Sequence, residues 1–364
     1  MTRRRPLLSA LGRVLIGLAV ILLLAPTVLP PFLDRIYYRG PASNHFNGER
    51  FLNPEGDPPQ DRSGMIRFLL GRDRVPWPAM VPVVPSRPPA RVAGRAMRVT
   101  WVGHATVLVQ TQGLNILTDP IWSERASPVG FAGPKRVRAP GIRFADLPKI
   151  DLVLVSHNHY DHLDLPTLRR LWQRDRPLIV TGLGNDTVIA QAGVPAVTRD
   201  WGGRVAIRPG IDVIVERVHH WGSRYGADRA RALWSGFTVT LPGGNLFFAG
   251  DTAFGDGGWE RAAAGDGPYR FAILPIGAYR PRALMASNHL DPAEAVAVFR
   301  TLDPAAALAI HWGTFQLTDE AIGEPPALLA RTLAAQRIAP GRFRATEVGQ
   351  AWDVPDRVID RAAR

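Results

Sequence analysis

Residues 151–164 constrain this chain more than any other stretch, because they join a run typical of a buried strand to a dense group of metal-binding side chains. The apolar residues 152–155 have the length and the β-branched content of a strand in a sheet core. The polar segment that follows carries four candidate ligands within six residues, namely His157, His159, Asp161 and His162. This arrangement indicates a metal site at the end of a strand.

The spacing of these ligands predicts two metal ions. In an extended segment, residues i and i+2 point to the same side, so His157 and His159 are expected to converge on one cation. A turn at Tyr160 would direct Asp161 and His162 toward a second cation. The alternative is a polar loop whose histidines lie in water or satisfy one another. A single histidine fits that alternative far better than three histidines with an aspartate do.

Two further aspartates also follow apolar runs. Asp251 comes after residues 246–249, and a carboxylate at the end of a buried strand beside two dications is the expected bridging ligand, since one oxygen can serve each metal. Asp119 follows residues 115–118, where it would either orient a ligand histidine or cap a turn. His104, between two strand-like runs, is interpreted as a structural residue.

The pattern His-x-His-x-Asp-His resembles the signature of the metallo-β-lactamase superfamily. A narrower resemblance, to the N-acylphosphatidylethanolamine-hydrolysing phospholipase D family and its bacterial relatives, covers roughly residues 96–350 and rests on motifs in that family's order. The motifs are Ser-His-Asn-His-Tyr-Asp-His-Leu-Asp (156–164), Phe-Phe-Ala-Gly-Asp-Thr (247–252), Pro-Ile-Gly-Ala-Tyr (275–279), His-Leu-Asp-Pro-Ala-Glu-Ala (289–295) and Ile-His-Trp-Gly-Thr-Phe (310–315).

This resemblance implies an α/β fold, the four-layer αββα sandwich, and a complete set of ligands. The first metal would be held by His157, His159 and His220, and the second by Asp161, His162 and His311, with Asp251 bridging them. The family's ligand directly precedes the tryptophan, so His220 is preferred over His219, which is expected to be structural.

The resemblance also implies the catalytic residues and the metal. Asp161, Asp251 and His289 are the candidate catalytic residues; His289 would position substrate, with a structural role at a helix start as the alternative. Zn²⁺, two ions per chain, suits His/Asp ligation without thiolate, and iron or manganese also fits.

A hydrolase of the phospholipase D type is the function that the resemblance implies. It would cut N-acylphosphatidylethanolamine-like phospholipids to phosphatidic acid and an N-acylethanolamine. The alternatives are a lactonase or other carboxylic-ester hydrolase of the same superfamily, and a non-enzymatic, membrane-tethered metal-binding protein of the envelope.

The composition indicates which classes of binding partner the protein favours. The formal charge of +12 comes almost wholly from arginine and favours anionic partners such as phospholipid headgroups or another phosphodiester. Nucleic acid is not expected, because no aromatic-interleaved basic run or nucleic-acid motif is present. The chain has no cysteine, so neither disulfides nor thiolate ligands contribute.

The first part of the chain predicts a signal anchor or transmembrane helix over residues 1–34. Arg3, Arg4 and Arg5 precede an uncharged apolar run over residues 14–28, and no clean cleavage site follows it. The arginines predict a cytoplasmic amino terminus and a catalytic domain anchored on the extracytoplasmic side, with export after signal cleavage as the alternative.

The rest of the chain divides into three parts. Residues 35–96 read as an irregular, proline-rich connector over the domain surface, with His45 in a turn or at the surface. Residues 97–354 would form the hydrolase domain, and residues 355–364 a tail.

Within the domain, Asp164 and Asp291 are expected to cap helices over residues 165–174 and 292–300, and residues 237–249 to form a hairpin. Residues 121–150 are expected to form a long loop at the active-site mouth. Its apolar and basic side chains would contact an acyl chain and a phosphate or, equally, lie in solvent; they are Trp122, Phe131, Lys135, Arg136 and Arg138.

Overall fold

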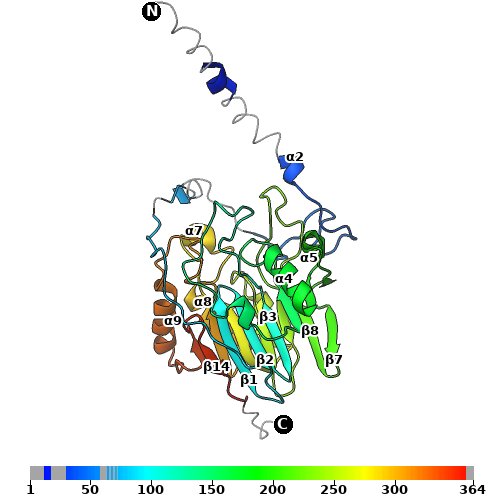
Figure 1. The fold of residues 1–364 in the computed structure, drawn as a ribbon, viewed down its shortest axis with the longest axis vertical. Coiled ribbons are helices and arrows are strands. Elements are labelled where there is room, and N and C mark those ends of the chain that lie inside the picture. The colour runs from blue at the N-terminus through cyan, green and yellow to red at the C-terminus, as the bar shows by residue number, and fades with distance from the viewer. Residues whose placement is uncertain are drawn as a thin grey trace, which may run out of the picture.

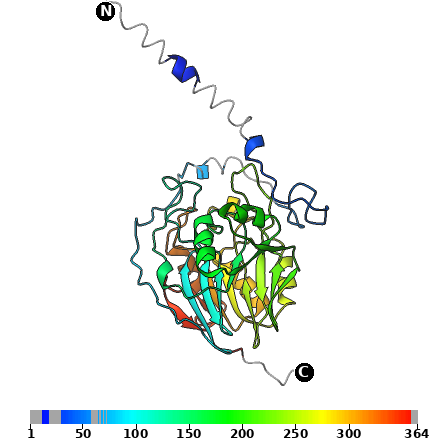
Figure 2. The same ribbon diagram turned by 45° about the vertical axis from the view of Figure 1, so that its right-hand side comes forward.

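The computed structural model describes residues 12–17, 30–57, 64, 67–68, 70–71 and 73–357. Two seven-stranded sheets pack face to face, with helices on their outer faces (Figures 1 and 2).

The first sheet has the strand order β14-β1-β2-β3-β4-β5-β6. Neighbours from β14 to β3 pair antiparallel, whereas those from β3 to β6 pair parallel. Its strands are β1 (Met97–Gly103), β2 (Thr106–Thr111), β3 (Leu114–Thr118), β4 (Leu152–Val155), β5 (Leu178–Gly182), β6 (Val197–Arg199) and β14 (Ala351–Asp353). The β4 strand lies in the parallel part and is buried on both faces, which explains its uninterrupted apolar sequence.

The second sheet has the order β13-β12-β11-β10-β9-β8-β7. The strands from β7 to β10 pair antiparallel and those from β10 to β13 pair parallel, and β9 and β10 form the expected hairpin. Its strands are β7 (Arg204–Arg208), β8 (Ile211–Glu216), β9 (Gly236–Val239), β10 (Asn245–Phe248), β11 (Tyr269–Pro275), β12 (Ala306–Ile310) and β13 (Phe343–Arg344).

Helices cover the outer face of each sheet. On the first sheet, α5 contacts β5 and β6; on the second, α8 contacts β11 as well as α6 and α9. The helices are α2 (Pro30–Leu33), α4 (Leu165–Asp175), α5 (Asn185–Ile189), α6 (Gly258–Ala264), α7 (Arg282–Met285), α8 (Pro292–Leu302) and α9 (Glu324–Ala335), with short 3₁₀ turns η1 (Phe144–Asp146) and η2 (Ala190–Ala192). The expected helix-sheet-sheet-helix layering is therefore confirmed.

The β4 strand shows how one short sequence serves two cores. Leu152 and Leu154 point into the apolar cluster between the sheets. Val153 and Val155 point the other way, into a second cluster that includes residues of α4. This alternation follows from the two-residue period of a strand, and it fixes where the ligand loop after Val155 begins.

The two expected helix caps have different outcomes. Asp291 forms a capping box with Glu294 at the start of α8, as predicted. Asp164 does occupy the N-cap position of α4, but its side chain accepts no capping hydrogen bond from the helix backbone. Its carboxylate instead accepts the backbone N–H groups of Trp122 and Ser123, so it ties the loop before the site to the helix.

The expected membrane segment falls mainly on residues 18–29, which lie outside the described residues, so it stays a prediction. Residues 12–17 and α2 are helical. No helix in the described parts of the chain is long and apolar enough to cross a membrane.

The segment before the hydrolase domain contributes to the core rather than only covering it. Tyr37, Phe46 and Phe51 are buried. His45 lies at a bend, as the expected turn requires, but the expected surface position is wrong, because its ring stacks on Trp201 at a centroid distance of 4.5 Å and is largely buried. Aromatic packing outweighs the polar character of this turn.

Candidate metal centre

The candidate ligands gather at one edge of the two sheets, because each follows the carboxyl end of a strand. In the first sheet β1, β3 and β4 run in the same direction, as do β8, β10 and β12 in the second. The residues that closely follow these strands are His104, Asp119, residues 157–162, His219, His220, Asp251 and His311.

The first group of ligand atoms consists of His157, His159 and His220, which lie close enough to share one ion. The Nε2 atom of His157 is 2.8 Å from Nδ1 of His159, and Nε2 of His220 is 3.4 Å from that same atom. The other nitrogen of His220, Nδ1, donates to the carbonyl of Asn288 at 2.9 Å. That hydrogen bond fixes the tautomer in which Nε2 carries the free lone pair.

The second group contains Asp161, His162 and His311, the three ligands expected for the second metal. The Nε2 atoms of both histidines lie 3.4 Å from Oδ2 of Asp161. The structure also places His104 here, with Nε2 2.9 Å from the same oxygen. His104 was expected to be structural rather than a ligand; its position in this cluster was not predicted, and it arises because a left-handed turn directly after β1 directs its ring there.

Asp251 lies between the two groups. Its Oδ2 atom is 3.0 Å from Nε2 of both His162 and His311, and 3.9 Å from Nε2 of His220. One carboxylate oxygen therefore reaches the ligand atoms of both groups, which is the position a bridging ligand needs.

Asp119 occupies the position expected of a residue that orients a ligand. Its Oδ2 atom accepts from Nδ1 of His162 at 2.7 Å, and its two oxygens also accept the backbone N–H and the hydroxyl of Ser156. Both the histidine and the aspartate side chains are fully buried. With Nδ1 engaged, Nε2 of His162 is the atom left to bind a metal.

His289 lies at the edge of the centre, ahead of α8. Its Nδ1 atom is 3.8 Å from Oδ2 of Asp251, and its ring stacks near that of His311 at 5.3 Å. It does not cap α8, since Asp291 does so. Its side chain is 14% exposed, whereas those of His220 and His311 are closed to solvent, so solvent reaches His289.

The charges of these groups depend on burial and on each other. Burial and the surrounding histidines lower the pKa of His157 and His220 well below the usual value, and burial lowers the pKa of His159 to about 4. Burial opposes a charge on His311 as well, but Asp251 and Asp161 outweigh it and raise its pKa to about 9. The histidines of the first group are thus neutral lone-pair donors at neutral pH.

The donor set fits a pair of dications. Several of its buried nitrogen and oxygen atoms have no hydrogen-bond partner among the described residues, although such orphans are costly in a folded protein. These atoms are His162 Nε2, His311 Nε2 and Asp251 Oδ1. Two metal ions would satisfy them, and neutral imidazole with carboxylate is a ligand set that zinc accepts.

His219, the neighbour of His220, points away from the ligand groups. Its Nδ1 atom pairs with the carboxylate of Glu55, and its Nε2 atom lies 3.5 Å from Asp57. Burial opposes a charge, but Asp57 and Glu55 outweigh it and raise the pKa of His219 to about 9. Sequence reasoning missed both carboxylates, because nothing local links residues 55 and 57 to a strand end at residue 219.

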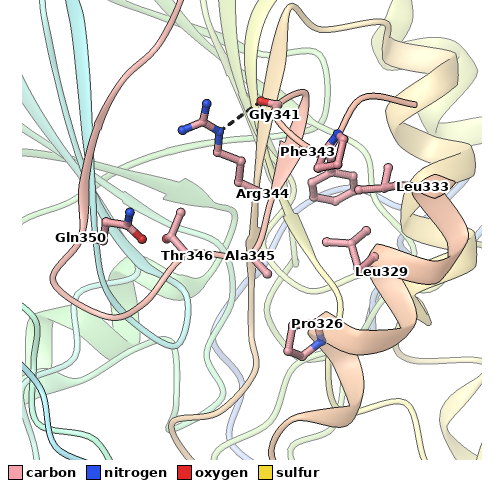
Figure 3. A pocket seen from close by; sticks show the side chains of 11 residues that line it. Pro326, Leu329, Leu333, Gly341, Phe343, Arg344, Ala345, Thr346 and Gln350 are labelled. Atoms are coloured by element: carbon pink, nitrogen blue, oxygen red, sulfur yellow. Dashed lines mark hydrogen bonds between the residues drawn. The ribbon is translucent and has the colours of Figure 1, made fainter. Parts of the chain in front are cut away.

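The long loop was expected to contact substrate through basic and aromatic residues. Most of these side chains instead form hydrogen bonds with the protein backbone. Arg136 donates to the carbonyls of Ser123 and Ile121, and Trp122 donates to that of Ile142. Arg138 donates to the carbonyl of Gly313. Phe131 remains available, with an exposure of 84%, whereas the ammonium group of Lys135 lies 3.9 Å from the carboxylate of Glu124. A cavity of about 450 Å³ between α9 and β13 lies elsewhere and is lined by no histidine or carboxylate (Figure 3).

Comparison with known proteins agrees with this geometry. A model described as the Beta-lactamase superfamily domain matches residues 114–312. The chain belongs to the metallo-β-lactamase superfamily. It is a hydrolase of that family, with His/Asp clusters capable of binding metal.

Two similar proteins are named for the same activity. The chain is 36% identical to N-acyl-phosphatidylethanolamine-hydrolyzing phospholipase D 1 of Caenorhabditis elegans over 270 residues, which cover 71% of this chain and 76% of that protein. It is 32% identical to the mitochondrial N-acyl-phosphatidylethanolamine-hydrolyzing phospholipase D of Saccharomyces cerevisiae over 62% of this chain and 49% of that protein. The expected resemblance to this narrower family is confirmed.

Solved structures support the fold. The metallo hydrolase Igni18 from Ignicoccus hospitalis matches with a TM-score of 0.53 at 19% identity, covering 72% of this chain and all of that one (100%). An isothiocyanate hydrolase from Delia radicum gut bacteria matches with a TM-score of 0.55 at 20% identity, covering 70% and 98%. At such identities these matches establish the two-sheet α/β metallo-β-lactamase fold alone.

Proposed function

We propose that this protein is a binuclear metal-dependent phosphodiesterase of the phospholipase D type. The observation that carries the proposal is the position of Asp251, whose Oδ2 atom lies between two groups of histidine nitrogens. The similarity to N-acylphosphatidylethanolamine-hydrolysing phospholipases D supports the choice of a phosphodiester bond.

The ligands divide into two shells around that carboxylate. His157, His159 and His220 would hold one ion, and Asp161, His162 and His311 the other, with Asp251 between them. His104 contacts Asp161 and so restrains the position of a ligand. When bound, the ions would supply an activated water and stabilise negative charge on a phosphoryl oxygen.

The remaining residues orient the reacting groups. Asp119 keeps Nδ1 of His162 engaged, so the ring cannot turn its other nitrogen away from the centre. His289 is partly exposed, and it would position substrate beside Asp251. We assign zinc as the metal, because neutral imidazoles and carboxylates without thiolate suit it; iron and manganese are outcomes that metal analysis would reveal.

The substrate we propose is an N-acylphosphatidylethanolamine-like phospholipid, cut to phosphatidic acid and an N-acylethanolamine. Purified protein loaded with zinc would be tested on this lipid, a soluble phosphodiester, a lactone and a carboxylic ester, with chelator-treated protein as the control. Metal-dependent turnover of the phosphodiesters would support the proposal. Turnover of the lactone or ester alone would overturn it.

We further propose that the amino-terminal segment anchors the domain to a membrane on the extracytoplasmic side. The test compares full-length protein with a chain beginning at Pro30, which keeps the pairs of Asp34 with Arg50 and Arg231. The shortened chain should retain turnover of a soluble phosphodiester but lose much of its rate on lipid in vesicles. Equal rates on vesicles at matched metal content would contradict the anchor.

A further inference from the structure

The loop after β8 places an arginine beside the candidate metal centre. Trp221 meets the ring of His159 edge-on at a centroid distance of 4.4 Å. The guanidinium carbon of Arg229 lies 3.7 Å from the centroid of the Trp221 ring. One indole therefore separates a cation from a candidate ligand of the first metal.

Arg229 differs from its neighbours, because no anionic partner for it lies in the described part of the chain. Among the described residues, its guanidinium forms no hydrogen bond and no ion pair. Arg224 donates to the carbonyls of Asn158 and Leu163, and Arg231 pairs with Asp34. Those two arginines hold the loop in place, whereas the donors of Arg229 contact none of the described residues.

The partial burial of Arg229 disfavours the charged form of its guanidinium. The side chain is partly buried, and burial lowers its pKa while the charge of Asp57 opposes that change. Its charge also extends to the centre, where it contributes to lowering the pKa of His159. Stacking on an indole fixes the plane of the guanidinium, so its donors are oriented before a ligand arrives.

We propose that Arg229, supported by Trp221, binds an anionic phosphate oxygen of the substrate on the His159 side of the metal centre. This inference rests on the proposed function and names the substrate feature that the site selects, a charged phosphate rather than a neutral ester. The planar fork of an arginine donates two parallel hydrogen bonds to phosphate oxygens, which a neutral lactone or carboxylic ester cannot accept in the same way.

The test compares Arg229→Gln and Arg229→Lys with a matched control, Arg176→Gln. Arg176 also stacks on a tryptophan, at 4.8 Å from the Trp172 ring centroid, but at the end of α4 remote from the ligand loop. Each zinc-loaded protein would be titrated calorimetrically with inorganic phosphate. Kinetics would be measured on a soluble phosphodiester and a neutral ester, and bound zinc would be counted.

Arg229→Gln should weaken phosphate binding and raise KM for the phosphodiester by about tenfold, the loss expected for a charge-assisted hydrogen bond. Changes in kcat and in any turnover of the neutral ester should be smaller. Arg229→Lys should recover part of the affinity, and Arg176→Gln should match the wild-type protein.

Two results would overturn the inference. One is wild-type phosphate affinity in Arg229→Gln at full zinc content. The other is loss of zinc in Arg229→Gln with full recovery in Arg229→Lys, which would make Arg229 a support for Trp221 only. Phosphate affinity is measured without turnover, so a failure of the phosphodiesterase proposal would be seen separately, in the kinetics alone.

Discussion

His219 and His220 are adjacent at the end of β8, yet their side chains lie in opposite surroundings. His220 faces His159 and Asp251, and its pKa falls well below the usual value because it is buried among other imidazoles. His219 faces the carboxylates of Glu55 and Asp57, which raise its pKa to about 9. The comparison shows that the partners of a buried histidine, rather than its burial, decide whether it offers a lone pair or carries a charge.

The two surroundings also differ in how completely they are satisfied. On the His219 side, Glu55 pairs with both His219 and Arg217, so its negative charge is balanced within the protein. Nε2 of His219 has no hydrogen-bond partner among the described residues, but it still lies 3.5 Å from the carboxylate of Asp57. On the His220 side, several nitrogens and an oxygen of Asp251 have no partner among the described residues. A balanced ion pair needs no ligand, whereas an unsatisfied donor set does.

The largest effect should follow from removing a ligand on the unsatisfied side. Asp161→Ala or His311→Ala should lose the second metal and reduce hydrolysis to the background rate, while the fold is largely retained because the ligands lie on loops at strand ends. Bound metal, turnover and circular dichroism would be measured. Full activity in a variant that has lost one metal would contradict the binuclear mechanism.

The adjacent histidines themselves give the sharpest test of the comparison. His220→Ala should be nearly inactive and should bind less metal, because it removes a ligand atom of the first group. His219→Ala should keep its metal and lose only part of its activity, since it breaks contacts with Glu55 and Asp57. Metal content and kcat/KM of the two variants would decide; the reverse order would show that the two roles are exchanged.

Asp119 tests a contact one step removed from the metals. Asp119→Asn keeps the size of the side chain but removes the negative charge that accepts from Nδ1 of His162. Residues in this position typically change metal affinity or activity by about 10- to 100-fold. Zinc affinity by competition with a chelator is the measurement, and wild-type affinity would show that Asp119 serves only the turn after β3.

The sequence predicted more of this site than of its surroundings, for a physical reason. Strand-end ligands such as Asp251 can be predicted from the sequence, because an apolar run followed by a polar loop is a local pattern. The contact of His104 with Asp161 was not predicted, because its turn lies between two antiparallel strands and only the tertiary fold brings it to Asp161. Glu55 and Arg229 were missed, since contacts with distant partners leave no periodic signal.

The short elements were missed for a related reason. The strand β7, at a sheet edge, has exposed arginines at its two ends and three consecutive apolar residues between them, and α6 and α7 have few residues in which a period could appear. These elements form because neighbouring strands and helices hold them, so packing rather than propensity specifies them.

Glu216, at the last position of β8, provides a third environment and the smallest predicted effect. This carboxyl is buried as Asp251 is, but without histidine partners. Burial raises its pKa to about 7, opposed by a hydrogen bond with Thr238, while Asp266 raises it further and Arg204 lowers it. Burial near imidazoles and burial apart from them thus shift two carboxyl groups in opposite directions.

The sign of the pH dependence follows from that difference. Between the usual pKa of 4.5 and the folded value of about 7, the unfolded chain carries an ionised Glu216 and the folded chain a protonated one. The folded state binds more protons, so the free energy of unfolding falls as pH rises through this window and levels off above it. At about 1.4 kcal/mol per pKa unit, the loss attributable to Glu216 is roughly 3 kcal/mol.

Glu216→Gln should remove this loss. Thermal unfolding from pH 5 to 8 should therefore show that the stability of the variant increases relative to that of the wild type as pH rises. If the stabilities of the variant and the wild type changed in parallel with pH, Glu216 would already be ionised in the folded protein. The opposite pKa shifts of Glu216 and Asp251 would then be contradicted, and only the comparison of His219 with His220 would remain.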